Sequence, residues 1–268
     1  FIRIYLSNLL LFASLYMLLP VLPMYLVERF DTSLSIAGGI LALFALSQFL
    51  LGPFYSYFID TFRRKNVCML SFLAVIAIVG GYSMVGTLLW VAVLRIIQGA
   101  LFGVATTMGS TLAIDITNTS RRSEANTCFG WAARLGMVFG AMIGLLLYKY
   151  EGLQQVLYAS IILGGIGLIF VSLIHVPFRA PIGAPVCSLD RFLLLRGWLP
   201  AINLILVSFV FGMLLTTINM YTESVQMQEM TLHFFILLAG GFVLAMIANK
   251  HVFENADIRA RVVSGLLL

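Results

Sequence analysis

Long uncharged runs separated by short charged segments are the feature that most constrains this chain. The hydrocarbon core of a bilayer is about 30 Å thick and is crossed by about 20 helical residues. In lipid the backbone polar groups must be satisfied within the segment, so each run is predicted to be α-helical. The run 66–114 carries only Arg95 and is long enough for two helices, with a turn near Gly86 and Thr87. The other predicted spans are 4–27, 32–59, 125–148, 152–174, 197–222, 231–249 and a run that begins at 262.

The composition agrees with this pattern along the whole chain of 268 residues. Hydrophobic residues make up 61% and charged residues 10%, whereas soluble domains carry about a quarter charged residues. The sequence therefore predicts an all-α polytopic membrane protein. The three cysteines have no metal-like spacing, and we expect no metal and no cofactor. The chain starts without Met and stops inside an apolar run, so we interpret it as part of a longer protein.

The basic residues predict the orientation of the spans. Twelve Lys and Arg fall in segments on one side of the predicted membrane, and two, Arg29 and Lys149, fall on the other. Because cytoplasmic loops are enriched in Lys and Arg, we expect a cytoplasmic amino terminus. This distribution accounts for the net charge of +5, and we expect no nucleic-acid partner.

A proline-rich segment divides the predicted helices into two groups. Pro177, Pro181 and Pro185 interrupt any continuous helix, and Ser188 could cap a short amphipathic helix after them. We expect a six-helix bundle over 1–176, a cytosolic linker over 177–197, and part of a second bundle over 198–268. This is the layout of a transporter built from two bundles.

Three stretches carry a resemblance to a known family. Residues 52–65 (GPFYSYFIDTFRRK) begin with Gly-Pro and continue to Asp60 and then to paired basic residues. Residues 94–104 (LRIIQGALFGV) contain Arg-x-x-Gln-Gly, and residues 115–125 (DITNTSRRSEA) contain Arg-Arg-x-Glu-Ala. In this order the stretches resemble the signature motifs of the major facilitator superfamily.

The resemblance implies a bundle of that family's type and a secondary transporter that works by alternating access. Residues 130–144 partly resemble its antiporter motif, so the implied activity is proton-coupled efflux of a small molecule or drug. The implied partners are a small-molecule substrate, the lipid bilayer and protons. We expect a monomer in a plasma membrane, as in the inner membrane of a prokaryote.

The signature loop has two interpretations. Its basic residues could serve only to fix topology. The resemblance instead implies a cytosolic latch whose charged residues pair in one conformation and separate in another. The residues assigned to this latch are Gly52, Pro53, Asp60, Arg64, Lys65, Asp115, Arg121, Arg122 and Glu124.

Two arginines lie deep in predicted spans. An intramembrane Arg is a functional candidate by default, and Arg95 shares a helical face with Gln98. The resemblance assigns Arg95 to proton or substrate coupling, whereas a purely structural role is the alternative for Arg95 and for Arg134. Together the two could attract an anionic substrate, such as a phosphate ester or a carboxylate. Four further polar residues could contact substrate or bond between helices: Asn8, Gln48, Asn203 and Asn219.

Glycines in two spans predict close helix packing. Small residues spaced four apart let neighbouring helices approach closely in membranes. The glycines concerned are Gly99, Gly103, Gly136, Gly140 and Gly144.

Other functional classes find less support. The sequence contains no HExxH, no GxSxG and no pair of intramembrane aspartates, which argues against an intramembrane enzyme. A seven-helix receptor would require an extracellular amino terminus, contrary to the predicted orientation.

Overall fold

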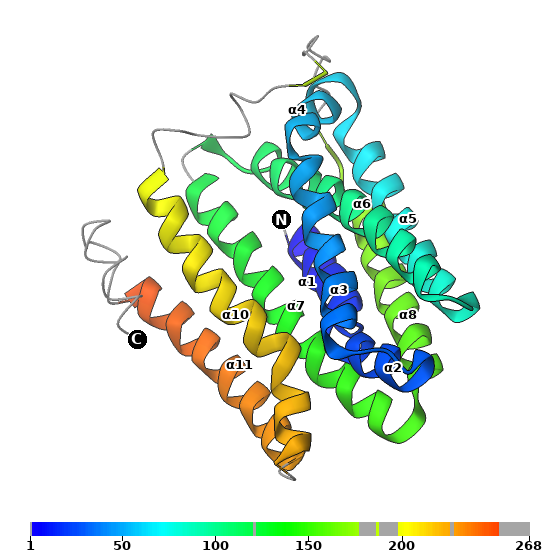
Figure 1. Cartoon of the computed structure of the whole chain (residues 1–268). Coiled ribbons are helices and arrows are strands. Elements are labelled where there is room, and N and C mark those ends of the chain that lie inside the picture. The colour runs from blue at the N-terminus through cyan, green and yellow to red at the C-terminus, as the bar shows by residue number, and fades with distance from the viewer. Residues whose placement is uncertain (1, 120–121, 177–185, 188–197, 226–227, 252–268) are drawn as a thin grey trace.

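The computed structural model describes residues 2–119, 122–176, 186–187, 198–225 and 228–251, and its regular elements there are helices. Figure 1 shows them as a bundle with α10 and α11 placed beside α7. The helices are α1 (Ile2–Tyr16), α2 (Val21–Phe30), α3 (Leu34–Leu50), α4 (Gly52–Thr61), α5 (Arg64–Gly81), the 3-10 turn η1 (Tyr82–Met84), α6 (Leu88–Asp115), α7 (Arg122–Glu151), α8 (Leu153–Ser172), α10 (Trp198–Ser224) and α11 (Gln228–His251).

These helices form seven segments long and apolar enough to cross a membrane, or eight when the bent pair α3 and α4 counts as one span. The predicted all-α polytopic fold is therefore confirmed. The predicted span that begins at 262 lies outside the described residues. So does the predicted linker, apart from residues 186–187. The division at that linker stays a prediction.

Two spans are broken at prolines, for a local reason. A proline lacks the backbone N–H, and its ring clashes with the carbonyl four residues earlier. Pro20 accordingly follows the end of α1 at Tyr16, and α2 begins at Val21. Pro53 lies in the first turn of α4, where the axis bends by 52° from that of α3. These breaks are fixed by the sequence itself.

The connection between α5 and α6 confirms the turn predicted near Gly86 and Thr87. The 3-10 turn ends at Met84, and α6 begins at Leu88. Thr87 caps α6, because its side chain accepts a hydrogen bond from the Trp90 N–H at 3.4 Å.

Helix α1 lies at the centre of the bundle and contacts α7 and α8 most extensively. A Cβ added to Gly136, Gly140 or Gly144 of α7 would lie 2.2–2.3 Å from a backbone carbonyl oxygen of α1. The three carbonyls belong to Leu9, Ala13 and Met17, which are also four residues apart. The glycine stripe of α7 therefore contacts the bare backbone of α1 along two helical turns.

The glycines of α6 occupy a similar position against α3 and α4. A Cβ on Gly99 would lie 2.1 Å from the Phe44 carbonyl oxygen, and one on Gly103 would lie 1.9 Å from the Tyr55 hydroxyl oxygen. These glycines therefore set how closely α6 approaches the bent span.

A pair of serines also joins α1 to α8. The Ser14 hydroxyl donates to the Ser160 carbonyl at 2.7 Å, and the Ser160 hydroxyl donates to the Ser14 carbonyl at 2.6 Å. Both side chains are buried, so the two helices are held by reciprocal hydrogen bonds inside the bundle.

Candidate functional site

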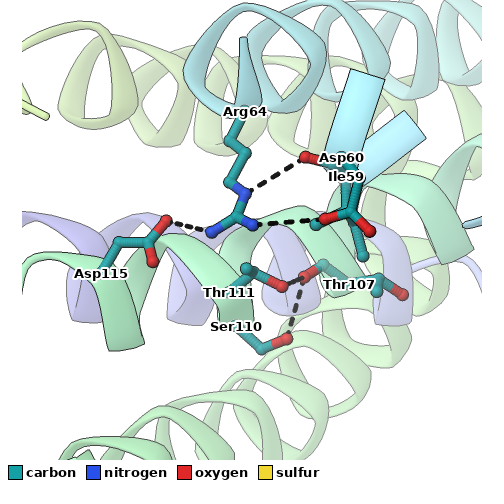
Figure 2. A network of polar contacts seen from close by, with 7 residues as sticks. All are labelled: Ile59, Asp60, Arg64, Thr107, Ser110, Thr111 and Asp115. Atoms are coloured by element: carbon teal, nitrogen blue, oxygen red, sulfur yellow. Dashed lines mark hydrogen bonds and ion pairs between the residues drawn. The ribbon is translucent and has the colours of Figure 1, made fainter. Parts of the chain in front are cut away.

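Arg64 is the centre of the charged cluster in the signature loop (Figure 2). Its Nη1 contacts the Asp115 Oδ2 at 2.5 Å, and its Nη2 lies 3.6 Å from the Asp60 Oδ1. Its Nε donates to the Ile59 carbonyl at 3.2 Å. One guanidinium thus joins α4, α5 and α6 at the end of the bundle where α4 turns into α5.

The cluster is largely shielded from solvent. The side chains of Arg64, Asp60 and Asp115 are 13%, 20% and 15% exposed. Two carboxylates share one guanidinium, so the cluster carries a net negative charge when both acids are ionised. Charge-assisted hydrogen bonds form at about 2.7–2.9 Å. Asp115 is therefore close enough to Arg64 for such a bond, whereas Asp60, at 3.6 Å, forms only a longer ion pair.

Lys65 and Arg3 contact a different helix end. Lys65 Nζ donates to the Ser172 carbonyl at 2.7 Å, and Arg3 Nη1 donates to the Leu173 carbonyl at 2.6 Å. These carbonyls end α8, where the last carbonyls lack partners within the helix and cations are favoured. The two basic residues therefore cap α8 in addition to any role in topology. The sequence did not predict this cap, because its partners are more than a hundred residues apart.

The remaining latch residues are only partly described. Gly52 and Pro53 lie at the bend between α3 and α4. Arg122 begins α7 and is exposed. Arg121 and the side chain of Glu124 lie outside the described part of the structure. The latch itself stays a prediction, and its described ion pairs lie within α4, α5 and α6.

Arg95 is almost fully buried, at 1% exposure. Its Nη1 lies 3.3 Å from the Gln98 Oε1, which also accepts from the Tyr82 hydroxyl at 2.9 Å. The guanidinium lies 5.8 Å from the Phe44 ring centroid and 5.7 Å from that of Tyr82. No protein partner in the described residues reaches Arg95 Nε and Nη2 or Gln98 Nε2. Arg95 has no exposed surface through which to contact a substrate in this conformation, and its role in coupling stays a prediction.

Arg134 differs from Arg95 in its exposure to solvent and in its neighbours. It is exposed on α7, and its guanidinium lies 5.5 Å from the Trp131 ring centroid. Arg134 still lies within the apolar span Ala125–Glu151, and its assignment to substrate or proton coupling stays a prediction. A single anion site formed by both residues lacks support here, because Arg95 is enclosed by other side chains. Lone arginines in apolar runs look alike in sequence, but packing encloses one and leaves the other accessible.

The four polar residues assigned to substrate have different surroundings. Asn8 is buried and donates to the Phe129 carbonyl at 2.9 Å, which joins α1 to α7. Gln48 is partly buried, and its backbone carbonyl accepts from the Tyr55 hydroxyl at 2.8 Å. Asn203 is exposed on α10, and the side chain of Asn219 is not described. Asn8 thus forms the interhelical bond that the sequence left as an alternative.

Contacts between the first six spans and α10–α11 include a buried cluster in the second half of α7. Val138 and Ala141 of α7 form a buried apolar cluster with Leu215 of α10 and Phe235 of α11. Nearer the start of α7, Arg134 is exposed. In Figure 1 the start of α10 lies toward the end of the molecule that carries the α4–α5 connection.

Comparison with known proteins places the chain in a family. A family model described as Major Facilitator Superfamily matches residues 4–268. Over 161 residues the chain is 28% identical to the tetracycline resistance protein, class C, of Escherichia coli, covering 57% of this chain and 39% of that protein.

Two solved structures share the fold. The human organic anion transporter MFSD10 (TETRAN) matches with a TM-score of 0.52 and 20% identity, over 63% of this chain and 45% of that one. The POT family transporter PepTSo matches with a TM-score of 0.55 and 18% identity, over 68% and 39% respectively. The chain thus spans less than half the length of each of these relatives. The match over nearly all of its residues shows that the chain belongs to the major facilitator superfamily of membrane transporters.

Proposed function

We propose that the full-length protein is a proton-coupled exporter of a small organic molecule that works by alternating access. The observation that carries this proposal is the match to the major facilitator superfamily over residues 4–268. The contact along α7 shows how the described part of the second half meets the first. Val138 and Ala141 are buried against α10 and α11, whereas Arg134 on the same helix is exposed. Alternating access requires two halves that touch at one end while the other end is open.

The charge distribution supports the direction of that opening. The end with the α4–α5 connection carries the basic residues that predict the cytoplasmic side. Arg64 and its two ion pairs lie at that end of the molecule. An exchange between states needs a small free-energy difference, and a few partly exposed ion pairs supply contributions of that size.

Efflux is supported by similarity to a protein named for tetracycline resistance. The same similarity makes tetracycline the first substrate to test. We further propose a prokaryotic inner membrane as the location and a monomer as the transporting unit.

The test is a transport assay with the full-length protein in proteoliposomes, with and without an imposed pH gradient. We expect tetracycline or another small organic compound to move against its concentration gradient only when protons flow the other way. Protein-free liposomes and liposomes with the gradient collapsed by an ionophore are the controls. Equal movement with and without the gradient across a broad substrate panel would contradict proton coupling.

A further inference from the structure

The face of α7 that meets α10 and α11 can be followed back to Arg134. Residues four and seven positions apart lie on one face of a helix. Arg134, Val138 and Ala141 have this spacing. Val138 and Ala141 are both 0% exposed and lie against Leu215 and Phe235. The side of α7 that carries Arg134 therefore faces α10 and α11, and Arg134 lies one turn beyond the point where this contact ends.

The depth of Arg134 makes its exposure informative. It lies nine residues into the apolar span Ala125–Glu151, which is about 13 Å along the helix axis at 1.5 Å per residue. A guanidinium at such depth is costly against lipid, so it faces a bundle interior or an aqueous space. Since its side of α7 faces α10 and α11, the exposed surface of Arg134 opens between the two parts of the protein.

Arg134 has no acidic partner among the described residues, where the ion pairs within 4.0 Å involve Arg64. Its neighbour is the ring of Trp131, one turn earlier and partly buried. A planar guanidinium binds a carboxylate through two parallel N–H donors. The indole beside it offers an apolar surface to a ring attached to that carboxylate.

We propose that Arg134 and Trp131 form a binding element for aromatic carboxylates between the two halves. This inference rests on the proposed transport function and adds the class of substrate. It assigns the negative charge of the substrate to Arg134 alone, without Arg95, which is enclosed by Phe44, Tyr82 and Gln98.

The test is equilibrium binding of tritiated naphthoate to the purified full-length protein in detergent. Naphthylmethanol, which has the same ring and no charge, serves as a competitor. We expect naphthoate to bind and naphthylmethanol to compete at least about tenfold more weakly, because a charge-assisted pair contributes about 1.5–3 kcal/mol. Absence of naphthoate binding, or equal competition by the alcohol, would overturn the proposal.

Variants locate the site. We expect Arg134→Gln to weaken naphthoate binding about tenfold or more, and Arg134→Lys to weaken it less, since Lys keeps the charge and loses the paired donors. Arg29→Gln is the matched control, because Arg29 is exposed at the end of α2 and should leave binding unchanged. Unchanged naphthoate affinity in Arg134→Gln would refute the assignment. If Arg134→Lys melts at the same temperature as the wild type, its weaker naphthoate affinity does not reflect misfolding. Binding needs no pH gradient, so an exporter without proton coupling could still pass this test.

Discussion

The contact between α1 and α7 gives the sharpest prediction about stability. Gly140→Ala adds one methyl group, which would lie 2.3 Å from the Ala13 carbonyl oxygen and 2.8 Å from its Cα. Both atoms belong to the backbone and cannot rotate away. Since ordinary contact begins near 3.4 Å, α1 and α7 must separate locally by about 1 Å.

The cost follows from a matched pair of substitutions. Gly165→Ala adds the same methyl group to α8, where no atom lies within 4 Å of the new Cβ. Alanine favours a helix over glycine by about 0.8–1.0 kcal/mol, and this gain applies to both variants. The difference between their free energies of unfolding is therefore the cost of overpacking, about 1–3 kcal/mol.

The assay is reversible unfolding of the full-length protein in mixed micelles, with increasing denaturing detergent and tryptophan fluorescence as the signal. We expect Gly165→Ala to unfold at the same or a higher denaturant level than the wild type, and Gly140→Ala at a lower one. Equal free energies of unfolding for the two variants would refute the close contact between the α7 glycines and the α1 backbone.

Three further predictions concern polar groups inside the bundle. Asp115→Asn should lower the free energy of unfolding more than Asp60→Asn, because Asp115 lies closer to the shared guanidinium; denaturation measures this, and a larger loss in Asp60→Asn would contradict it. Asp60→Asn should also slow turnover more than it weakens substrate binding. Transport kinetics measure both quantities, and weakened binding with normal turnover would contradict the latch. Arg95→Ala should abolish transport in liposomes while membrane insertion is retained, and normal transport would reject its coupling role. In a double-mutant cycle, Ser14→Ala and Ser160→Ala should be coupled by about 0.5–1.5 kcal/mol, whereas additive effects would show that the reciprocal hydrogen bonds contribute nothing to stability.

The sequence by itself determined the number and kind of spans. The length of each uncharged run matches the thickness of a bilayer, and this property needs no knowledge of neighbouring helices. Pro20 and Pro53 fixed the breaks in the first two spans, because a proline acts on the helix that contains it. The motif order likewise predicted the family, which the match over residues 4–268 confirms.

Only the tertiary structure decided what the charged residues contact. Arg95 and Arg134 are both single arginines in apolar runs, yet one is enclosed by three helical segments and the other is exposed beside Trp131. Lys65 was predicted as a topology marker, and it also caps a helix more than a hundred residues away. Hydropathy depends on local composition, whereas these contacts depend on which faces of distant helices meet. The glycine stripes, the serine pair and the apolar clusters together determine which helix faces pack against each other.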